Sequence, residues 1–311
     1  MNLGRVGVIL PGGGLRCAIQ VGFLEYIDKV GIKIEKILCA SGGAFNGAGY
    51  VESGSNALKM FWSKIDEIGY RYVFSGSGFV KLWHAARGNN AFCSDKGLWR
   101  LVNNLNMSKI INSPISLEIA VFNETTEEIE IVGNHEFKDD PAQHKLLRQF
   151  IKASASYSGI FPPEEIHAQT YSDPCGISAR SLSDMDTIFL VETGQPRQTV
   201  NPAKLNAVQR LIKKNSFMTD RQIESNLKEN FGGKFRVFPE DVKWAKENHS
   251  PFLRRIWELF KDGPVEKRLV LTDSSMNIDT LSLGYGEKGD ILKSIKHGYE
   301  RTEEILATLE S

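Results

Sequence analysis

A serine stands where an apolar segment meets a glycine-rich one, in the stretch KILCASGGAFNG at residues 36–47. Ser41 follows the apolar pair Ile37 and Leu38 closely and precedes two glycines. This order predicts a strand, a sharp turn and a helix, with the serine hydroxyl at the apex. Such a turn exposes Oγ and sets backbone amides beside it, as an acyl-transfer nucleophile requires. An ordinary strand-to-helix connection that contains a serine would have the same sequence.

A second glycine-rich stretch, PGGGLRC at residues 11–17, lies between an apolar run and a predicted helix. The first amides of a helix lack intrahelical partners and the helix dipole is positive there, so this turn can hold an anion. Three anions fit: a dinucleotide pyrophosphate, a nucleotide phosphate, or the oxyanion of a tetrahedral acyl intermediate.

The sequence departs from both nucleotide-binding patterns. Cys17 occupies the third small position of the dinucleotide fingerprint, and the second strand ends in Cys39 and Ser41 where an acid should hold the ribose. No lysine followed by serine or threonine closes the glycines, as a phosphate loop requires. The oxyanion interpretation is favoured because Ser41 follows the neighbouring predicted strand, so the amides and the hydroxyl meet at one edge of the sheet.

A nucleophilic serine needs a general base. In the Ser, Asp, His order of α/β-hydrolases, His249 or His297 would complete a triad. That fold builds several strands before its nucleophile, whereas here one predicted strand and one helix precede the strand that leads to Ser41. All six histidines lie in polar segments, which makes each of them a weak candidate.

The apolar pattern predicts alternating strands and helices. The continuous run Val6–Leu10 is typical of a strand buried on both faces, and a helix and a second strand follow it. The expected strands are 6–10, 34–38, 115–123, 128–132, 186–192 and 269–272, and the main helices are 15–30, 44–53, 58–65, 96–105, 145–155 and 290–309. We therefore expect an α/β fold with three layers, helix, sheet and helix, around a mainly parallel central sheet.

Composition narrows the class of protein. With 311 residues, 41% hydrophobic and 24% charged, the chain resembles an ordinary soluble globular protein. Lysine plus arginine equals aspartate plus glutamate at 38 each, so net charge gives no attraction to nucleic acid. No segment reaches the ~18 apolar residues of a membrane span, and no signal peptide is evident. Four widely spaced cysteines fit a reducing compartment, so a cytoplasmic protein is expected.

We expect one domain over residues 1–311, with a polar helical insertion at about 196–264. In this insertion, SPFLRRIWELFKDGP places five apolar side chains on one helical face and basic residues elsewhere. The five are Phe252, Leu253, Ile256, Trp257 and Phe260. The pattern suits a helix at the surface of an anionic membrane. It is also typical of ordinary core packing.

Four ordered motifs carry a resemblance to a known family. They are GVILPGGGLRC, then CASGGAFNGAGYVESG, then ASASYSGIFPPEEI with TYSDPC, and finally LSLGYGEKGDILKSIKHGYERT. In this order they resemble the patatin-like phospholipase family of lipid acyl hydrolases. The resemblance implies hydrolysis of a carboxylic ester in a lipid or phospholipid, of the phospholipase A or lysophospholipase type. It further implies a Ser-Asp dyad without histidine and no metal or organic cofactor. The expected peripheral membrane contact rests on the SPFLRRIWELFKDGP pattern, and no oligomeric state is predicted.

Carried over by motif, the resemblance makes Ser41 the nucleophile and Asp173 the base. The implied oxyanion-hole residues are Gly12, Gly13, Gly14, Arg16 and Gly42. An aspartate at its ordinary pKa of about 3.9 is a poor base. Burial must therefore raise the pKa of Asp173 if the dyad is to work.

Some positions depart from the family pattern, because Cys17, Cys39 and the pair Pro174 and Cys175 stand where the family has glycine. Proline removes an amide and favours an extended Asp173. The departures leave open a weak or inactive lipid-binding or interaction protein, and an acyltransferase is a further alternative. Cysteines around one site also suggest oxidation or a soft metal. The substitute bases, should Asp173 be misplaced, are Asp184 and Asp186.

Overall fold

The computed structural model describes residues 2–69, 72–74, 91, 93–193, 221–238, 251–263, 267–272 and 288–310. Its strands are β1 (Val6–Leu10), β2 (Ile34–Cys39), β3 (Ser116–Asn123), β4 (Glu128–Gly133), β5 (Glu164–Ile166), β6 (Gln169–Ser172), β7 (Thr187–Val191), β8 (Arg236–Phe238) and β9 (Arg268–Thr272). Its named α-helices are α1 (Ala18–Lys29), α2 (Gly42–Ile68), α4 (Lys96–Asn103), α5 (Met107–Ile111), α6 (Pro141–Ser154), α9 (Pro251–Phe260) and α10 (Asp290–Glu310). Short 3-10 helices are η1 (Gly14–Cys17), η3 (Asn134–Glu136) and η4 (Ala179–Leu182).

The strands form one mixed sheet in the order β5-β6-β3-β2-β1-β7-β9-β8, with β4 also paired to β3. From β3 to β8 every neighbouring pair is parallel. The strands β4, β5 and β6 join antiparallel at the other end. The predicted parallel core is therefore confirmed, and an antiparallel extension is added to it.

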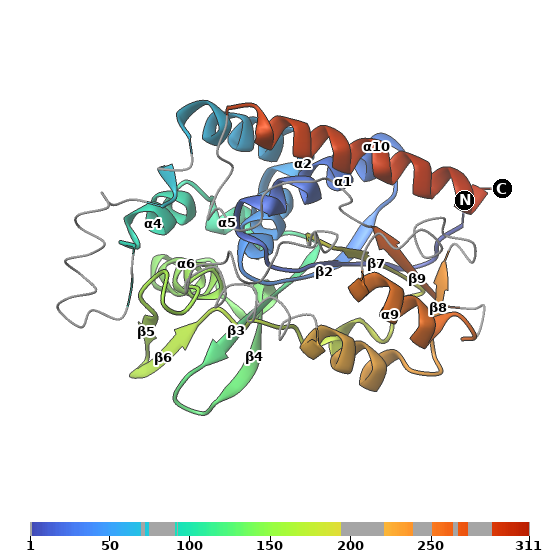
Figure 1. The fold of residues 1–311 in the computed structure, drawn as a ribbon. Helices are drawn as coiled ribbons and strands as arrows, with labels where there is room; N and C mark the ends of the chain where they lie inside the picture. The colour runs from blue at the N-terminus through green and yellow to red at the C-terminus, as the bar shows by residue number, and fades with distance from the viewer. Residues whose placement is uncertain are drawn as a thin grey trace, which may run out of the picture.

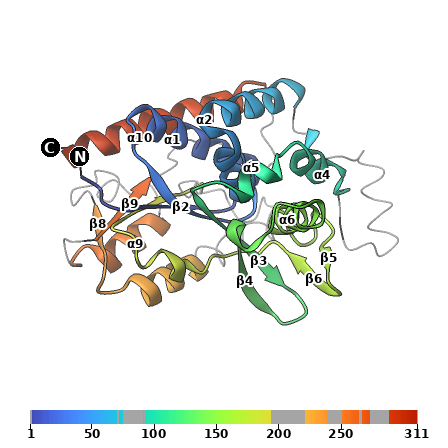
Figure 2. The ribbon, with the colours of Figure 1, turned by 180° about the vertical axis from the view of Figure 1, so that it is seen from behind.

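Two apolar layers sandwich the sheet because successive side chains of a strand point to opposite faces. In β1, Val8 and Leu10 belong to the core cluster with α1, α2 and α10, whereas Ile9 belongs to the second cluster with residues 221–231 and α9. Figures 1 and 2 show α1, α2 and α10 along one face of the sheet and α9 on the other. This arrangement confirms the expected three-layer α/β fold.

Helix α2 replaces two helices that the sequence predicted separately. Gly54 has φ 74° and ψ 179° inside it, so the helix is kinked there. Asp28 of α1 accepts the amide of Ser55 at 3.2 Å and the hydroxyl of Tyr50 at 2.6 Å. These contacts cap the second half of α2 and fix both halves to α1.

Helices α1 and α10 pack with their backbones in close contact. A Cβ atom at Gly22 would lie 1.9 Å from the carbonyl oxygen of Ile295, and one at Gly298 would lie 2.1 Å from that of Ile19. Gly298 of the closing motif therefore lets α10 approach α1. Residues 281–287 of that motif lie outside the described residues.

The polar segment 196–264 supplies more than helices. Its described parts are helical residues 221–231, strand β8, which joins the sheet beside β9, and α9. Ile256 and Phe260 of α9 are fully buried in the second core cluster. The apolar face predicted to suit a membrane surface is thus engaged in core packing at these two residues. The side chains of Phe252 and Leu253 lie outside the described part.

Candidate active site

The site lies at the carboxyl ends of β1, β2 and β7, where the strand order changes direction. From β1 the chain moves to β2 and β3 on one side, and it returns as β7 on the other side of β1. Such switch points open a crevice at the carboxyl ends of parallel strands. Here Thr193, just after β7, donates its hydroxyl to the carbonyl of Gly12, just after β1.

Ser41 occupies a strained turn between β2 and α2. Its φ is 56° with ψ −129°, a conformation that few residues other than glycine adopt. The following helix sits directly on the sheet, since a Cβ atom at Gly43 would lie 2.1 Å from the carbonyl oxygen of Leu10. The small residues after Ser41 therefore let the helix begin at once, and the hydroxyl stands at its N-terminus as the sequence predicted.

Asp173 follows β6 and is buried, with 6% of its surface exposed. Burial raises its pKa to about 6, although contacts with the hydroxyl of Ser41 and with Cys175 partly oppose the effect. Oδ1 accepts the amide of Cys175 at 2.9 Å, while Oδ2 is buried and makes no hydrogen bond of full geometry with the described residues. The Ser41 hydroxyl thus lies near enough to the carboxyl to lower its pKa without a hydrogen bond of full geometry, and catalytic pairs often tighten only when substrate binds.

The glycine-rich stretch at residues 11–17, called the glycine loop below, follows β1 and runs past Ser41. A Cβ atom at Gly12 would lie only 2.6 Å from Cβ of Ser41, so any larger residue would collide with the turn that carries Ser41. Arg16 donates both its amide and Nε to the carbonyl of Gly13, each at 3.2 Å. Arg16 therefore closes the loop on itself. Within the described part of the chain, four amides around Ser41 lack a hydrogen-bond partner, namely those of Gly12, Gly13, Gly14 and Gly42.

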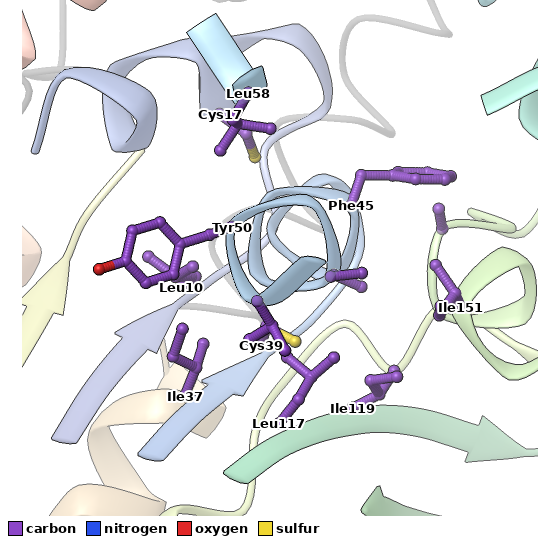
Figure 3. Close-up of a cluster of buried hydrophobic side chains, with 14 of the residues drawn as sticks. Leu10, Cys17, Ile37, Cys39, Phe45, Tyr50, Leu58, Leu117, Ile119 and Ile151 are labelled. Carbon is purple, nitrogen blue, oxygen red and sulfur yellow. The ribbon is translucent and has the colours of Figure 1, made fainter. Parts of the chain in front are cut away.

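The cysteines that replace family glycines are accommodated by the residues around the Ser41 turn. Cys17 lies under the start of α2, where a Cβ atom at Gly42 would be 2.7 Å from its Sγ. The thiol of Cys39 donates to the carbonyl of Glu118 at 3.3 Å, and Gly47 of α2 leaves room for it. Figure 3 shows Cys39 between α2 and Leu117 of β3. Cys175 has φ 45°, the left-handed conformation that a glycine would take without strain.

These thiols are poorly suited to redox or metal chemistry. Burial raises the pKa of Cys17 to about 12 and also raises the pKa values of Cys39 and Cys175. Reactive and metal-binding cysteines need a thiolate. In the described residues no three His, Cys, Asp or Glu side chains gather as a metal site would require. That these cysteines are simply small replacements for glycine is therefore better supported than oxidation or metal binding.

An apolar pocket opens beside Ser41. It encloses about 470 Å³, part of which is open to solvent. Its lining residues are Gly14, Leu15, Ser41, Gly42, Phe45, Phe61, Trp62, Ile65, Val73, Phe74, Leu98, Leu101, Ala155 and Phe161. Apart from the serine hydroxyl and the indole N–H of Trp62, these side chains are apolar. The pocket therefore suits a hydrocarbon chain whose reacting end lies at Ser41.

A buried polar network connects this pocket with the glycine loop. The indole of Trp62 donates to Oδ1 of Asn46 at 2.7 Å. The amide of Asn46 donates to the carbonyl of Cys17 at 2.7 Å and to Oε1 of Gln20 at 2.8 Å. Gln20 in turn donates to the carbonyl of Pro11 at 2.8 Å. The network thus links Trp62 and Asn46 of α2, through Gln20 of α1, to the segment that carries the loop amides.

Several contacts around the site were not predicted. Thr193, Asn46 and Gln20 bear on the glycine loop, and Ser154 and Ser156 contact the residues after β2 and β6. The segment ASASYSGIFPP contained the only sequence signal for the two serines. The substitute bases, by contrast, lie at the other end of β1, where Asp184 and Asp186 both bind Arg5.

A strained serine at a strand-to-helix turn, beside a buried carboxyl and unpaired amides, is typical of α/β hydrolytic enzymes with a nucleophilic serine. The model of the patatin-like phospholipase family matches residues 8–173, more than half of the chain. The chain belongs to the patatin-like phospholipase family. This membership confirms the resemblance of the four motifs and supports lipid hydrolysis as the activity.

The chain also matches solved structures at low sequence identity. VipD from Legionella pneumophila is 14% identical with a TM-score of 0.42, and the match covers 98% of this chain and 67% of that one. Human GIVD cytosolic phospholipase A2, solved with a methyl γ-linolenyl fluorophosphonate inhibitor, is 12% identical with a TM-score of 0.44. This second match covers 99% of this chain but 59% of the human one.

No curated protein sequence matches the chain. Among the described helices, none is both long and apolar enough to cross a membrane.

Proposed function

We propose that the protein is a serine lipid acyl hydrolase of the phospholipase A or lysophospholipase type, with Ser41 as nucleophile and Asp173 as base. The observation that carries this proposal is the contact between a strained, partly exposed serine and a buried aspartate whose pKa is raised to about 6. A carboxylate with this pKa is ionised at neutral pH and is a better proton acceptor than an ordinary aspartate.

The reaction has two halves. Oγ of Ser41 attacks the ester carbonyl while its proton moves to Asp173, and the tetrahedral intermediate then expels the alcohol, which takes that proton. Water attacks the resulting acyl-enzyme and gives a proton to Asp173. The fatty acid leaves as this proton returns to Oγ. All atoms and protons of the two half-reactions are accounted for without a redox partner or cofactor.

The oxyanion formed in both halves would bind the unpaired amides of the glycine loop and the first turn of α2. These donors are backbone groups held by neighbouring elements, so little reorganisation is needed when negative charge develops. The positive end of the α2 dipole adds to the same stabilisation. Loss of one such donor typically costs about 3 to 4 kcal/mol of transition-state stabilisation.

The apolar pocket argues for a lipid ester over a polar one. Among the described residues no charged side chain lines it, and ligand pockets of this apolar character favour hydrocarbon groups. An acyl chain can enter it with its carboxyl carbon at Ser41. A head group would then remain outside, at the open end of the site.

Fatty acid release from phosphatidylcholine and lysophosphatidylcholine micelles tests this proposal. The wild type should release fatty acid, and Ser41→Ala and Asp173→Asn should lower the rate by at least 10³-fold while remaining folded. Leu101→Trp, which fills the pocket wall, should reduce hydrolysis of long-chain esters far more than that of acetate esters. Equal rates for the wild type and Ser41→Ala would contradict the proposal and favour a lipid-binding protein.

A further inference from the structure

Strands β2 and β6 approach each other end to end along one edge of β3. β4 occupies the other edge, since it pairs with Glu118 through Asn123. On the shared edge, β2 ends with Cys39 opposite Ile119, and the antiparallel β6 ends with Ser172 opposite Phe122. The residues that follow these two ends, including Ser41 and Asp173, therefore face a gap beside the middle of β3.

The carboxyl end of α6 fills this gap. The hydroxyl of Ser154 donates to the carbonyl of Ala120 at 2.7 Å and accepts the amide of Ser41 at 2.9 Å. Two residues later, the carbonyl of Ser156 accepts the amide of Asp173 at 3.1 Å. Both of these serines are fully buried. One short segment thus holds the nucleophile on one side and the aspartate on the other.

From these contacts we infer that Ser154 is a positioning residue for the Ser41–Asp173 pair. The inference rests on the proposed function and goes further, because it names the group that fixes the nucleophile. Ser41 has a positive φ, and such a conformation persists only where the surroundings hold it. The hydroxyl of Ser154 is the side-chain group that binds the Ser41 amide, and its second bond anchors it to β3.

The bonding of Ser154 also fixes the separation of the two reacting groups. Ser154 ties Ser41 to Ala120 of β3, whereas the backbone of Ser156 ties Asp173 to the same end of α6. Ala155, between the two serines, lines the apolar pocket. The end of α6 therefore sets the nucleophile, the base and one wall of the pocket relative to one another.

Ser156 provides a matched control for a test of this inference. It is equally buried, it lies on the same turn, and its hydroxyl donates to the carbonyl of Lys152 at 3.0 Å, away from Ser41. Its bond to Asp173 uses the backbone and survives Ser156→Ala. A general loss of packing at the end of α6 would affect Ser154→Ala and Ser156→Ala alike.

Steady-state hydrolysis of a short-chain ester by the two variants gives the first measurement. Ser154→Ala should lower kcat about 10- to 100-fold with KM nearly unchanged, as expected when a reacting group is misplaced. The pH midpoint of its activity should stay close to that of the wild type, because burial, the largest influence on the pKa of Asp173, is unchanged. Ser156→Ala should keep kcat within about threefold. Equal losses in the two variants would overturn the inference.

Amide hydrogen exchange gives a second measurement that needs no catalysis. The amide of Ser41 should exchange at least tenfold faster in Ser154→Ala than in Ser156→Ala. An unchanged Ser41 amide would overturn the positioning role even in an active enzyme. A wild type that hydrolyses no ester would instead contradict the proposed function, while the exchange rates would still decide what holds Ser41.

Discussion

Cys175 donates its backbone amide to Oδ1 of Asp173 at 2.9 Å, across the proline that separates the two residues. The amide that Pro174 lacks is therefore not the one that this carboxylate oxygen uses. The substitution of the family glycines at these positions thus preserves a hydrogen bond to the proposed base.

The pH dependence of hydrolysis follows from the raised pKa of Asp173. Only the ionised carboxylate can accept the proton of Ser41, so kcat/KM should rise about tenfold per pH unit below pH 6 and level off above it. A rate profile from pH 4.5 to 8 checks this expectation. A midpoint near 4 would show that burial does not tune this group.

Asp173→Asn should make the protein more stable at neutral pH while it abolishes activity. The folded-state pKa of about 6 lies above the ordinary 3.8, so the folded protein binds the proton more tightly than the unfolded chain does. Stability of the wild type therefore falls as pH rises from about 4 to 6. The neutral asparagine avoids this loss, which is roughly 1–3 kcal/mol at pH 7.

Urea unfolding of the wild type and Asp173→Asn at several pH values measures this difference. The advantage of the variant should be small at pH 4 and should reach its full size above pH 6. A variant that is less stable at pH 7, or a difference that does not vary with pH, would be inconsistent with a buried ionised aspartate.

Cys175→Gly should move the activity profile to higher pH. The thiol of Cys175 lowers the pKa of Asp173 by donating to it, so its removal should raise that pKa further. Glycine also suits the left-handed backbone at this position, and the backbone amide that binds Oδ1 is kept. Cys175→Ser retains a side-chain donor and serves as the control. Profiles that coincide for Cys175→Gly and the wild type would exclude a role for the thiol.

Asn46→Leu should destabilise the fold and impair catalysis together. The substitution leaves the indole N–H of Trp62 and Oε1 of Gln20 unpaired, and each such buried group costs about 1–3 kcal/mol. The loss of unfolding free energy should be at least about 2 kcal/mol, measured by chemical denaturation. The value of kcat should fall because Gln20, which donates to Pro11 of the glycine loop, loses the hydrogen bond that orients its side chain.

Tyr50→Phe is the comparison for Asn46→Leu on the same helix. It removes one hydrogen bond, to the exposed carboxylate of Asp28, which water can replace. Its loss should be about 1 kcal/mol, with kcat unchanged. Similar effects of the two substitutions on kcat would contradict a link between Asn46 and the glycine loop.

Much of the fold could be predicted because its signals are local. The continuous apolar run Val6–Leu10 identified a buried strand, and the glycines after it and after Ser41 identified two tight turns at helix starts. Parallel strands place such turns at one edge of the sheet, so the meeting of the glycine loop and Ser41 followed from topology. The motif resemblance supplied Asp173, which periodicity alone did not distinguish from Asp184 or Asp186.

The rest depended on long-range contacts that no local pattern encodes. The end-to-end approach of β2 and β6 on β3 arises from pairing across the chain, so the place of Ser154 between them was not predictable. The environment of α9 could not be predicted for a similar reason, because an apolar stripe on a helix can face either a membrane or the sheet. Here Ile256 and Phe260 pack into the core. The fit of Cys39 likewise depends on Gly47, a residue of the facing helix.

Covalent labelling with a fluorophosphonate, followed by peptide mass spectrometry, tests the central claim most directly. The account predicts one adduct per chain, located on Ser41, absent from Ser41→Ala and formed much more slowly in Asp173→Asn. Folded wild-type protein whose Ser41 stays unlabelled at neutral pH would contradict it, and an adduct on another residue would do so equally.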